Sequence, residues 1–385
     1  MAHADRHRFP GARGPWARFD GPAGTLMVDA AIDATTDFLR SGHMANLGGV
    51  FEAARVTDET VWDARVAVAA MLGADPEGIV FGANSTSLIL SLVRWIEPAL
   101  GAGDVVLCTQ LDHDANVAPW LHAARRTGAE VRLVPVDTGT GRLRLDVLDD
   151  LCDGRVRWVA VTGASNVIGT MPDLKAVITT AHGNGAHVLV DAVHLAPHAP
   201  IDIADLDCDA LVTSPYKWYG PHSGVLWLSP SLRAGIEPVN VRTAPTDPPR
   251  RFETGTVSIE ALAGLAAAAR YVVDTRAQPK PEDEVFPVLF SGLQAMAHVT
   301  VVGPPGLEDR TPTVAFQVDG HTPKEVAAAL AAEQVAVWSG HHYALELMKA
   351  YGVWETGGVA RAGVVRYTTE DDVARLLKAV QALKP

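Results

Sequence analysis

The middle of the chain alternates between helical and strand-like hydrophobic patterns. "TDETVWDARVAVAAMLG" (57–73) places apolar residues at helical spacing behind a Thr/Asp start. Short Val-rich runs bounded by Gly, Asp or Pro follow it, and they predict strands at 79–83, 104–110, 130–136, 156–163, 187–193 and 209–215. Because these strands are almost continuously apolar and helical segments separate them, they predict a mostly parallel α/β sheet.

The last third of the chain has a different pattern. A charged, Pro-rich stretch, "DTRAQPKPEDE" (274–284), predicts a linker. After it we expect strands at 313–318 and 335–339, a helix opened by a capping box from Thr322 to Glu325, and a strand and helix within 363–380. We therefore expect an N-terminal segment (1–24), a large domain (25–273) and a small α+β domain (285–385) to which the N-terminal segment belongs.

Composition and charge narrow the class of protein. The chain has 385 residues, which favours two domains, and 48% hydrophobic with 20% charged residues is typical of a soluble globular protein. The net charge is −13 and no basic stripe is visible, so we expect no nucleic-acid partner. The N-terminal twenty residues lack an apolar signal region, and no run approaches a membrane span, so we expect a cytoplasmic protein without a membrane partner.

The cysteines and histidines show no metal-ligand or disulfide pattern. Cys108, Cys152 and Cys208 are too few and too far apart for either, and we interpret them as buried core residues in a reducing compartment. His194 and His198 have a spacing found in zinc sites but lack Cys or carboxylate companions at suitable spacing. We therefore expect no bound metal.

Polar side chains follow the predicted strands one after another. In an open parallel sheet, ligands bind beyond the carboxyl ends of the strands. After the first strand come two hydroxyl side chains, Ser85 and Thr86, at a predicted helix start, where free backbone N–H groups suit an anion. The strand-end residues are Ser85 and Thr86, His113, Ser165 and Asn166, Asp191 and His194, and Ser214, Tyr216 and Lys217.

This set of side chains suits pyridoxal phosphate. The phosphate needs an anion site, the ring needs a stacking face, its nitrogen needs a carboxylate, and a lysine forms the Schiff base. The order "STS … LDHDAN … ASNVIGT … DAVHLAPHAPIDI … SPYKWYGPHSG … FETGT … VRYTTEDD" resembles the cysteine desulfurase-like branch of the class V aminotransferases, over about residues 20–385. The resemblance implies a fold-type I enzyme with a mostly parallel seven-stranded sheet.

The resemblance also implies a role for each matching residue. Lys217 would hold the cofactor covalently, His113 would stack on its ring, and Asp191 would pair with its nitrogen. The substrate side would be lined by Asn46 and Asn166, with Arg361 on the substrate carboxylate. The remaining cofactor contacts would be His194 near the phenolic oxygen, Ser85, Thr86, Ser214 and Tyr216 on the phosphate, and Thr256 on the phosphate of the other subunit of a homodimer.

The chain departs from the branch in one loop. Desulfurases of this branch carry a reactive Cys in a stretch like "RTGHHC", whereas this chain has "WSGHHY" (338–343). Tyr343 stands at the Cys position, and a protonated phenol cannot replace a thiolate nucleophile. Trp338 stands at the Arg position, which suggests a bulkier or less polar substrate than cysteine.

The departure leaves several reactions open. We expect C–S β-elimination on cysteine or an S-substituted cysteine, without an enzyme persulfide. The alternatives are aminotransferase or decarboxylating deaminase activity on a similar amino acid, cysteine desulfurase or selenocysteine lyase activity, and a non-catalytic pyridoxal-phosphate-binding protein. The sequence does not distinguish the substrate side chain.

Overall fold

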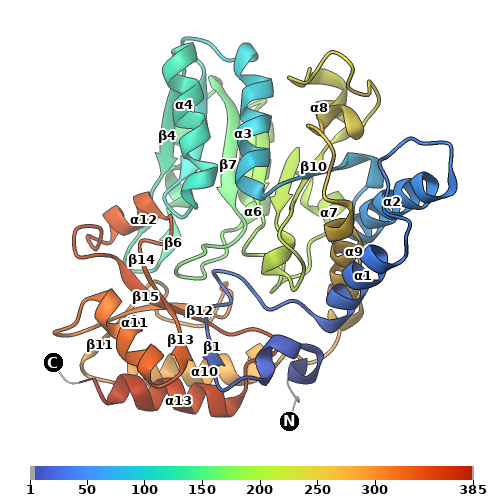
Figure 1. Cartoon of the computed structure of the whole chain (residues 1–385). Helices are drawn as coiled ribbons and strands as arrows, with labels where there is room; N and C mark the ends of the chain where they lie inside the picture. The colour runs from blue at the N-terminus through green and yellow to red at the C-terminus, as the bar shows by residue number, and fades with distance from the viewer. Residues whose placement is uncertain (1–4, 384–385) are drawn as a thin grey trace.

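The computed structural model describes residues 5–383, and its centre is a seven-stranded sheet (Figure 1). The strand order is β2-β10-β9-β8-β7-β3-β4, in which only β10 runs antiparallel to its neighbours. The seven strands are β2 (Ile79–Gly82), β3 (Val105–Thr109), β4 (Glu130–Val134), β7 (Val156–Thr162), β8 (His187–Asp191), β9 (Ala210–Thr213) and β10 (Gly224–Leu228). The predicted mostly parallel seven-stranded sheet is confirmed.

Helices cover both faces of this sheet, because its strands bury side chains on both sides. In β3, Val105 and Leu107 belong to one hydrophobic cluster, whereas Val106 and Cys108 belong to another. The flanking helices are α1 (Asp29–Arg40), α2 (Glu52–Leu72), α3 (Ser85–Ile96), α4 (Ala118–Thr127), α5 (Leu148–Leu151), α6 (Leu174–Gly183), α7 (Ile203–Leu206), α8 (Pro230–Gly235) and α9 (Ile259–Thr275). Helices α3 and α4 lie together over one face (Figure 1).

A second, antiparallel sheet has the order β11-β12-β15-β14 and a hydrophobic cluster of its own. Its strands are β11 (Val299–Val302), β12 (Thr313–Val318), β14 (Trp338–Gly340) and β15 (Val359–Gly363). The helices beside it are α10 (Pro281–Gln294), α11 (Pro323–Ala332), α12 (Leu345–Ala350) and α13 (Glu370–Gln381). Strands β5 (Val136–Asp137) and β6 (Arg142–Leu143) form a separate short hairpin.

The N-terminal segment lies against both parts of the molecule. Its strand β1 (Ala17–Arg18) pairs with β13 (Val335–Ala336), and Phe19 is buried in the cluster of the second sheet. A few residues later, the Thr25 N–H donates to the Tyr216 carbonyl at 2.8 Å. The segment therefore runs from the second sheet to the carboxyl end of strand β9 in the first sheet.

Three local expectations about the C-terminal part were inaccurate. The run 335–339 is two strands, because β13 pairs with the N-terminal segment while β14 pairs with β15. The predicted strand at the start of 363–380 lies earlier, at Val359–Gly363. Helix α10 begins inside the predicted linker, at Pro281. The capping box from Thr322 to Glu325 is present.

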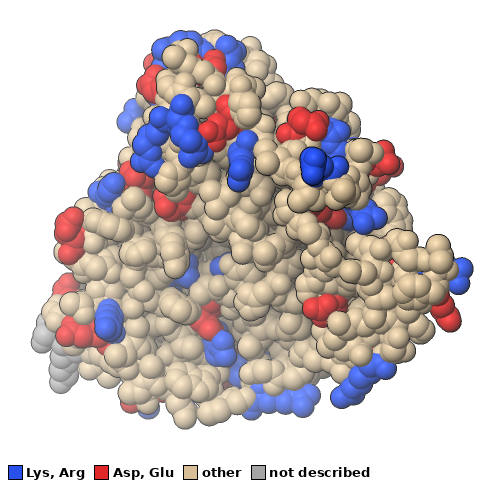
Figure 2. Space-filling model, turned by 45° about the horizontal axis from the view of Figure 1, so that its top comes forward, with Lys and Arg blue, Asp and Glu red and all other residues tan. Residues whose placement is uncertain are grey.

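The surface and helices add two facts about possible partners. Basic and acidic side chains are interspersed on the face shown in Figure 2. Among residues 5–383, no helix combines the length and apolar character needed to cross a membrane.

Candidate active site

The strand-end residues meet at one edge of the seven-stranded sheet because the strands that carry them are parallel. His113 follows β3, Asn166 follows β7, Asp191 ends β8, and Lys217 follows β9. Lys217 lies close enough to Asp191 and Arg361 for both charges to act on its pKa. Arg361 comes from β15 of the other sheet, so the site lies where the two sheets approach each other.

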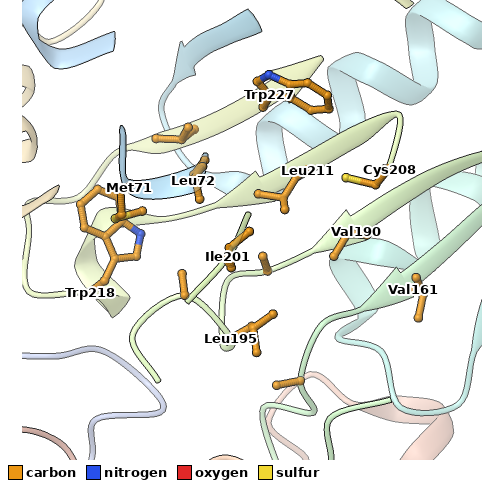
Figure 3. Close-up of a cluster of buried hydrophobic side chains, with 14 of the residues drawn as sticks. Met71, Leu72, Val161, Val190, Leu195, Ile201, Cys208, Leu211, Trp218 and Trp227 are labelled. Atoms are coloured by element: carbon orange, nitrogen blue, oxygen red, sulfur yellow. The ribbon is translucent and has the colours of Figure 1, made fainter. Parts of the chain in front are cut away.

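Lys217 is fixed by the turn that ends β9. The neighbouring Trp218 is fully buried beside Met71 and Leu72 (Figure 3), and its indole N–H donates to Thr213 Oγ1 at 3.1 Å. The Lys217 Nζ donates to the backbone carbonyls of Pro22 at 2.5 Å and Ala23 at 3.0 Å. Burial, and then Arg361, lower the pKa of Lys217 to about 7, although Asp191 opposes the shift. The amine is therefore a usable nucleophile and base near neutral pH.

Asp191 is a buried carboxyl with few partners of its own. The Val193 N–H donates to its Oδ1 at 2.9 Å, and burial raises the pKa of Asp191 to about 6. A second carboxyl that the sequence did not single out, Asp112, is also buried and accepts hydrogen bonds from Thr109 and Asn116. Burial raises the pKa of Asp112 to about 8.

His113 presents a neutral ring at the same edge. Its Nδ1 accepts from the Ala115 N–H at 3.1 Å, which fixes the ring at the start of a short turn. Burial, followed by Lys217 and Arg361, lowers the pKa of His113 to about 4. A neutral imidazole with a fixed plane is suited to stacking on another ring.

The start of helix α3 forms an anion site. Asn84 caps the helix, and the Ser85 N–H donates to Ser214 Oγ at 3.3 Å, so the helix start lies beside the end of β9. A Cβ at Gly224 would come within 2.4 Å of the Asn84 carbonyl carbon, so the close packing of β10 here requires glycine. Exposed Thr86 lies in the same helical turn. Because Ser214 and the Asn84 cap take the N–H groups of Ser85 and Ser87, the Thr86 N–H and the hydroxyls of Ser85 and Thr86 are the groups suited to a phosphate.

Tyr216 lies next to Lys217 and is stacked on a residue that the sequence did not single out. The Tyr216 and His222 rings are 5.0 Å apart with an interplanar angle of 12°, and Lys217 Nζ is 5.0 Å from the Tyr216 ring. His222 belongs to the quoted motif "SPYKWYGPHSG", which was the available signal for it. The stacked pair forms an aromatic wall beside the lysine.

Arg361 and Asn166 offer polar atoms that the protein leaves unpaired. Arg361 is 4% exposed, and its Nη1 donates to the Asn166 carbonyl at 2.7 Å. Among the described residues, Arg361 Nε and Asn166 Oδ1 are buried without a hydrogen-bond partner. Burial lowers the pKa of Arg361 to about 9. A buried guanidinium with an unused N–H is suited to a carboxylate ligand.

The loop after β14 closes the other side of this arginine. Trp338 is directly opposite Arg361 in the strand pairing, so both side chains project from the same face of the sheet. The loop is held by two hydrogen bonds, from Asn166 Nδ2 to the His342 carbonyl at 2.8 Å and from the Asp114 N–H to the Tyr343 carbonyl at 2.6 Å.

The loop conformation directs Tyr343 toward His113. His342 and Tyr343 both have left-handed backbones, with φ of 51° and 57°. The Tyr343 ring lies 5.3 Å from that of His113 with an interplanar angle of 31°, and Trp338 and Tyr343 are 54% and 66% exposed. Trp338 beside Arg361 and Tyr343 beside His113 are therefore two large aromatics that are not buried in this chain.

His194 is held from behind by residues of the second sheet region. Its Nε2 lies 3.0 Å from Thr313 Oγ1 and 3.2 Å from Thr311 Oγ1. Burial, followed by His198 and Lys217, lowers the pKa of His194 well below its usual value, so the ring is neutral. Neither threonine was identifiable from the sequence, because their contact with His194 spans more than a hundred residues.

Asn46 and Thr256 are brought to each other rather than to Lys217. Both are exposed and line a pocket of about 310 Å³, which also includes Asn240, Arg250 and Glu253. Among the described residues, no hydrogen bond connects either side chain to the Lys217 cluster. Their assigned roles remain predictions, and that of Thr256 requires a second subunit.

The cluster fits pyridoxal phosphate on its own chemistry. It offers an amine with a lowered pKa, a buried carboxyl, a neutral imidazole face and a helix start for the phosphate, and it leaves Arg361 Nε and Asn166 Oδ1 unpaired for a ligand. By contrast, residues 5–383 contain no group of three or more His, Cys, Asp or Glu that could hold a metal ion.

Comparisons with known proteins show the family of the chain. The aminotransferase class-V family model matches residues 18–376. Cysteine desulfurase of Escherichia coli O127:H6 is 33% identical over 386 residues, covering 96% of this chain and 93% of its own length. Cysteine desulfurase of Shigella sonnei is 32% identical with the same coverage.

Solved structures show the same fold. The apo cysteine desulfurase of Thermococcus onnurineus is 26% identical with a TM-score of 0.91, covering 98% of this chain and 96% of that one. The cysteine desulfurase CsdA of Escherichia coli, an S-sulfonic acid form, is 28% identical with a TM-score of 0.88, covering 97% and 96%. A mutant of C-DES with glycine covalently linked to its PLP cofactor shares the fold at 21% identity and a TM-score of 0.84, covering 99% and 100%.

Proposed function

The chain belongs to the class V aminotransferase family of pyridoxal-phosphate-dependent enzymes, and we propose that it catalyses C–S β-elimination on cysteine or an S-substituted cysteine. In this proposal no persulfide forms on the enzyme. We further propose that the protein works in the cytoplasm as a homodimer.

Bound pyridoxal phosphate supplies an electron sink that acidifies the Cα–H of an attached amino acid. Lys217 would hold the cofactor, Asp191 would face its ring nitrogen, and His113 would cover its ring. Arg361 and the unpaired Asn166 oxygen would orient the substrate, the arginine through the substrate carboxylate.

The residues of this chain would then carry out the elimination. The Lys217 amine, freed when the amino group of the substrate takes its place on the cofactor, would take the proton from Cα; as a free amine it has a pKa of about 7. The sulfur leaves Cβ with its electron pair as the Cα–Cβ double bond forms, so no enzyme nucleophile is consumed. His113, in ring contact with Tyr343, would cover the cofactor face on this side.

The absence of an available thiol at the site carries this proposal. Cys108, Cys152 and Cys208 are 0%, 1% and 4% exposed, and Cys208 lies in the core near Leu211 (Figure 3). Burial raises the pKa of Cys208 to about 12 and that of Cys108 well above its usual value. Since a thiolate is the nucleophilic form, none of these sulfurs is suited to accept sulfur from a substrate.

Two exposed aromatics support an S-substituted substrate. Trp338 presents apolar surface next to Arg361, the residue proposed for the substrate carboxylate, and Tyr343 presents it next to His113. An apolar wall favours a substrate whose sulfur carries a carbon substituent over free cysteine.

Cysteine desulfurase or selenocysteine lyase activity is the second candidate, because the named relatives are cysteine desulfurases. Aminotransferase or decarboxylating deaminase activity uses the same apparatus, and a non-catalytic pyridoxal-phosphate-binding protein is the fourth alternative. The presence of both Lys217 and Asp191 argues against the last.

A cysteine-free variant separates the first two candidates. We expect the triple substitution of Cys108, Cys152 and Cys208 by Ala to retain turnover, apart from the stability cost of altering core positions. Wild-type protein should be screened against amino acids and S-conjugates by absorbance, with product mass analysis. The sulfur should appear on a released thiol or as sulfide. A persulfide on any of the three cysteines during turnover would overturn the proposal in favour of the desulfurase.

A further inference from the structure

Behind His194 lies a buried polar pair whose function the preceding assignments leave open. His198, on the loop after β8, and Glu282, in the first turn of α10, have side chains 5% and 3% exposed. His198 Nδ1 and Glu282 Oε1 are 3.4 Å apart, longer than a good hydrogen bond, and both atoms lack any other partner among the described residues. Buried polar atoms are rarely left unpaired, so a third group should contact both atoms from one side.

Tyr219 supplies a third unpaired atom, on a cavity that His198 also lines. Its hydroxyl is buried without a partner, and burial, followed by the Glu282 carboxylate, raises the pKa of Tyr219. Tyr219 and His198 both line a cavity of about 30 Å³. That volume holds one or two water molecules, and an adjoining pocket of about 280 Å³, lined by His198 and Glu282, gives water a route inward.

The backbone at Tyr219 shows that its position is enforced. This bulky residue has φ of 71°, in the left-handed region that residues with a Cβ seldom adopt. Its N–H donates to Thr25 Oγ1 at 2.9 Å, and its carbonyl accepts from Val28 at 3.0 Å. Such strain persists only where the surroundings hold it.

The polar cluster reaches the cofactor side through ring contact. The His194 and His198 rings are 5.4 Å apart with an interplanar angle of 68°, so one ring packs edge-on against the other. The Thr311 and Thr313 hydroxyls hold His194 Nε2. The orientation of His194 is therefore set jointly by these hydroxyls and by the ring of His198.

We propose that Glu282, His198 and Tyr219 form a water-binding site that positions His194 from behind. The bridging water is the ligand of this site, and Glu282 makes His198 carry its proton on Nδ1. Glu282 belongs to the helix that precedes the second sheet, so the site ties α10 to the loop that follows Asp191. The inference rests on the proposed function in that it assumes His194 faces the cofactor.

Glu282→Gln tests the site, because it keeps the shape of the side chain and replaces an acceptor oxygen with an N–H donor. We expect His198 to change from the Nδ1–H to the Nε2–H tautomer in solid-state ¹⁵N NMR of histidine-labelled apoprotein. The ¹⁵N signal of His198 is identified as the one that disappears in the His198→Asn variant. In the loaded enzyme, kcat should fall roughly tenfold with KM unchanged, the scale on which residues that orient a site histidine act.

Two further variants keep the test decisive. Asp283→Asn makes the same charge change at the exposed neighbouring position and should leave both the tautomer and kcat unchanged. If Glu282→Gln does not fold, Tyr219→Phe removes a single hydroxyl. We expect a crystal structure of the wild-type apoprotein to show the bridging water and that of Tyr219→Phe to lack it. An unchanged His198 tautomer in Glu282→Gln, or a wild-type crystal structure without this water, would overturn the proposal. Because the NMR and crystal readouts use the apoprotein, they are independent of whether the proposed function is correct.

Discussion

At the residue scale, Lys217 combines a fixed position with an amine that is easy to deprotonate. Its pKa of about 7 means that the ammonium form, which cannot attack an aldehyde, predominates only below neutral pH. We expect the rate at which the apoprotein takes up pyridoxal phosphate to rise with pH and level off above about 8, with a midpoint near 7. Stopped-flow absorbance measures this rate.

Two controls accompany the Lys217 measurement. Lys217→Ala should abolish covalent uptake, and exposed Lys175→Ala should leave it unchanged, while borohydride reduction should tag the peptide that contains Lys217. A rate that keeps rising tenfold per pH unit above pH 8 would show an ordinary lysine and contradict the lowered pKa. A tag on another lysine would show that the site is wrongly assigned.

Arg361 and Trp338 are neighbours across β14 and β15, yet we expect their substitutions to act differently. Arg361→Ala removes a charge-assisted contact to a carboxylate that all amino acids share, so KM should rise for every substrate, by tenfold or more on the scale of such hydrogen bonds. Trp338→Ala removes an apolar wall, so it should change the ratio of kcat/KM between bulky and small S-substituents. Kinetics on a series of S-conjugates measures both. If Trp338→Ala changes kcat/KM equally for all S-conjugates, Trp338 does not determine substrate specificity.

At the element scale, the start of helix α3 depends on the glycine opposite it. Gly224→Ala would place a Cβ 2.4 Å from the Asn84 carbonyl carbon, so the helix start must move away from Ser214. We expect a loss of about 1–3 kcal/mol in the free energy of unfolding and weaker binding of pyridoxal phosphate. Urea unfolding and cofactor titration measure the two effects.

Gly235→Ala is the matched control for Gly224→Ala. A Cβ at Gly235, at the end of α8, meets nothing within 4 Å, so stability and cofactor binding should stay unchanged. If Gly224→Ala binds the cofactor as the wild type does, the helix start is not the phosphate site.

Most strands of the seven-stranded sheet could be predicted from the sequence, whereas the pairing of strands near the C-terminus could not. The runs of the parallel sheet were predictable because both of their faces are buried, and His113, Asp191 and Lys217 were predictable because parallel strands end at one edge. Strand β10 was not identified individually, although its apolar run is similar to the others. The run 335–339 divides because its two halves pair with strands from opposite ends of the chain.

The parts of the site that were missed depend on tertiary packing. Asp112 is next to His113 in the sequence, but nothing local shows that it is buried and faces Thr109 and Asn116. The carbonyls of Pro22 and Ala23, which hold Lys217, carry no side-chain signal at all. Contacts over such distances follow from the crossing of the N-terminal segment, which a hydrophobic pattern does not encode.

At the scale of the whole molecule, the exposed pocket of Asn46 and Thr256 suggests that one chain is incomplete. Large apolar side chains are exposed near it in the sequence, with Val50 at 95% and Val241 at 69% exposed. An apolar surface of this kind is typical of an interface. A second copy covering it would bury these side chains and bring Thr256 to another subunit's site, as the homodimer proposal requires.

Mixed dimers test this arrangement directly. Thr256→Ala should weaken cofactor binding about tenfold, through a lost hydrogen bond to a charged phosphate, and Lys217→Ala should be inactive. In a mixed dimer of the two, the Lys217→Ala chain still provides Thr256 to the partner, whose own Lys217 is intact, so one site is native. We therefore expect cofactor affinity and activity per intact Lys217 to return to the wild-type level, measured on dimers purified with two different tags. If Thr256 instead serves its own chain, the only site with Lys217 keeps the Thr256→Ala defect and nothing is restored. A fully active monomer in sedimentation would contradict the shared site altogether.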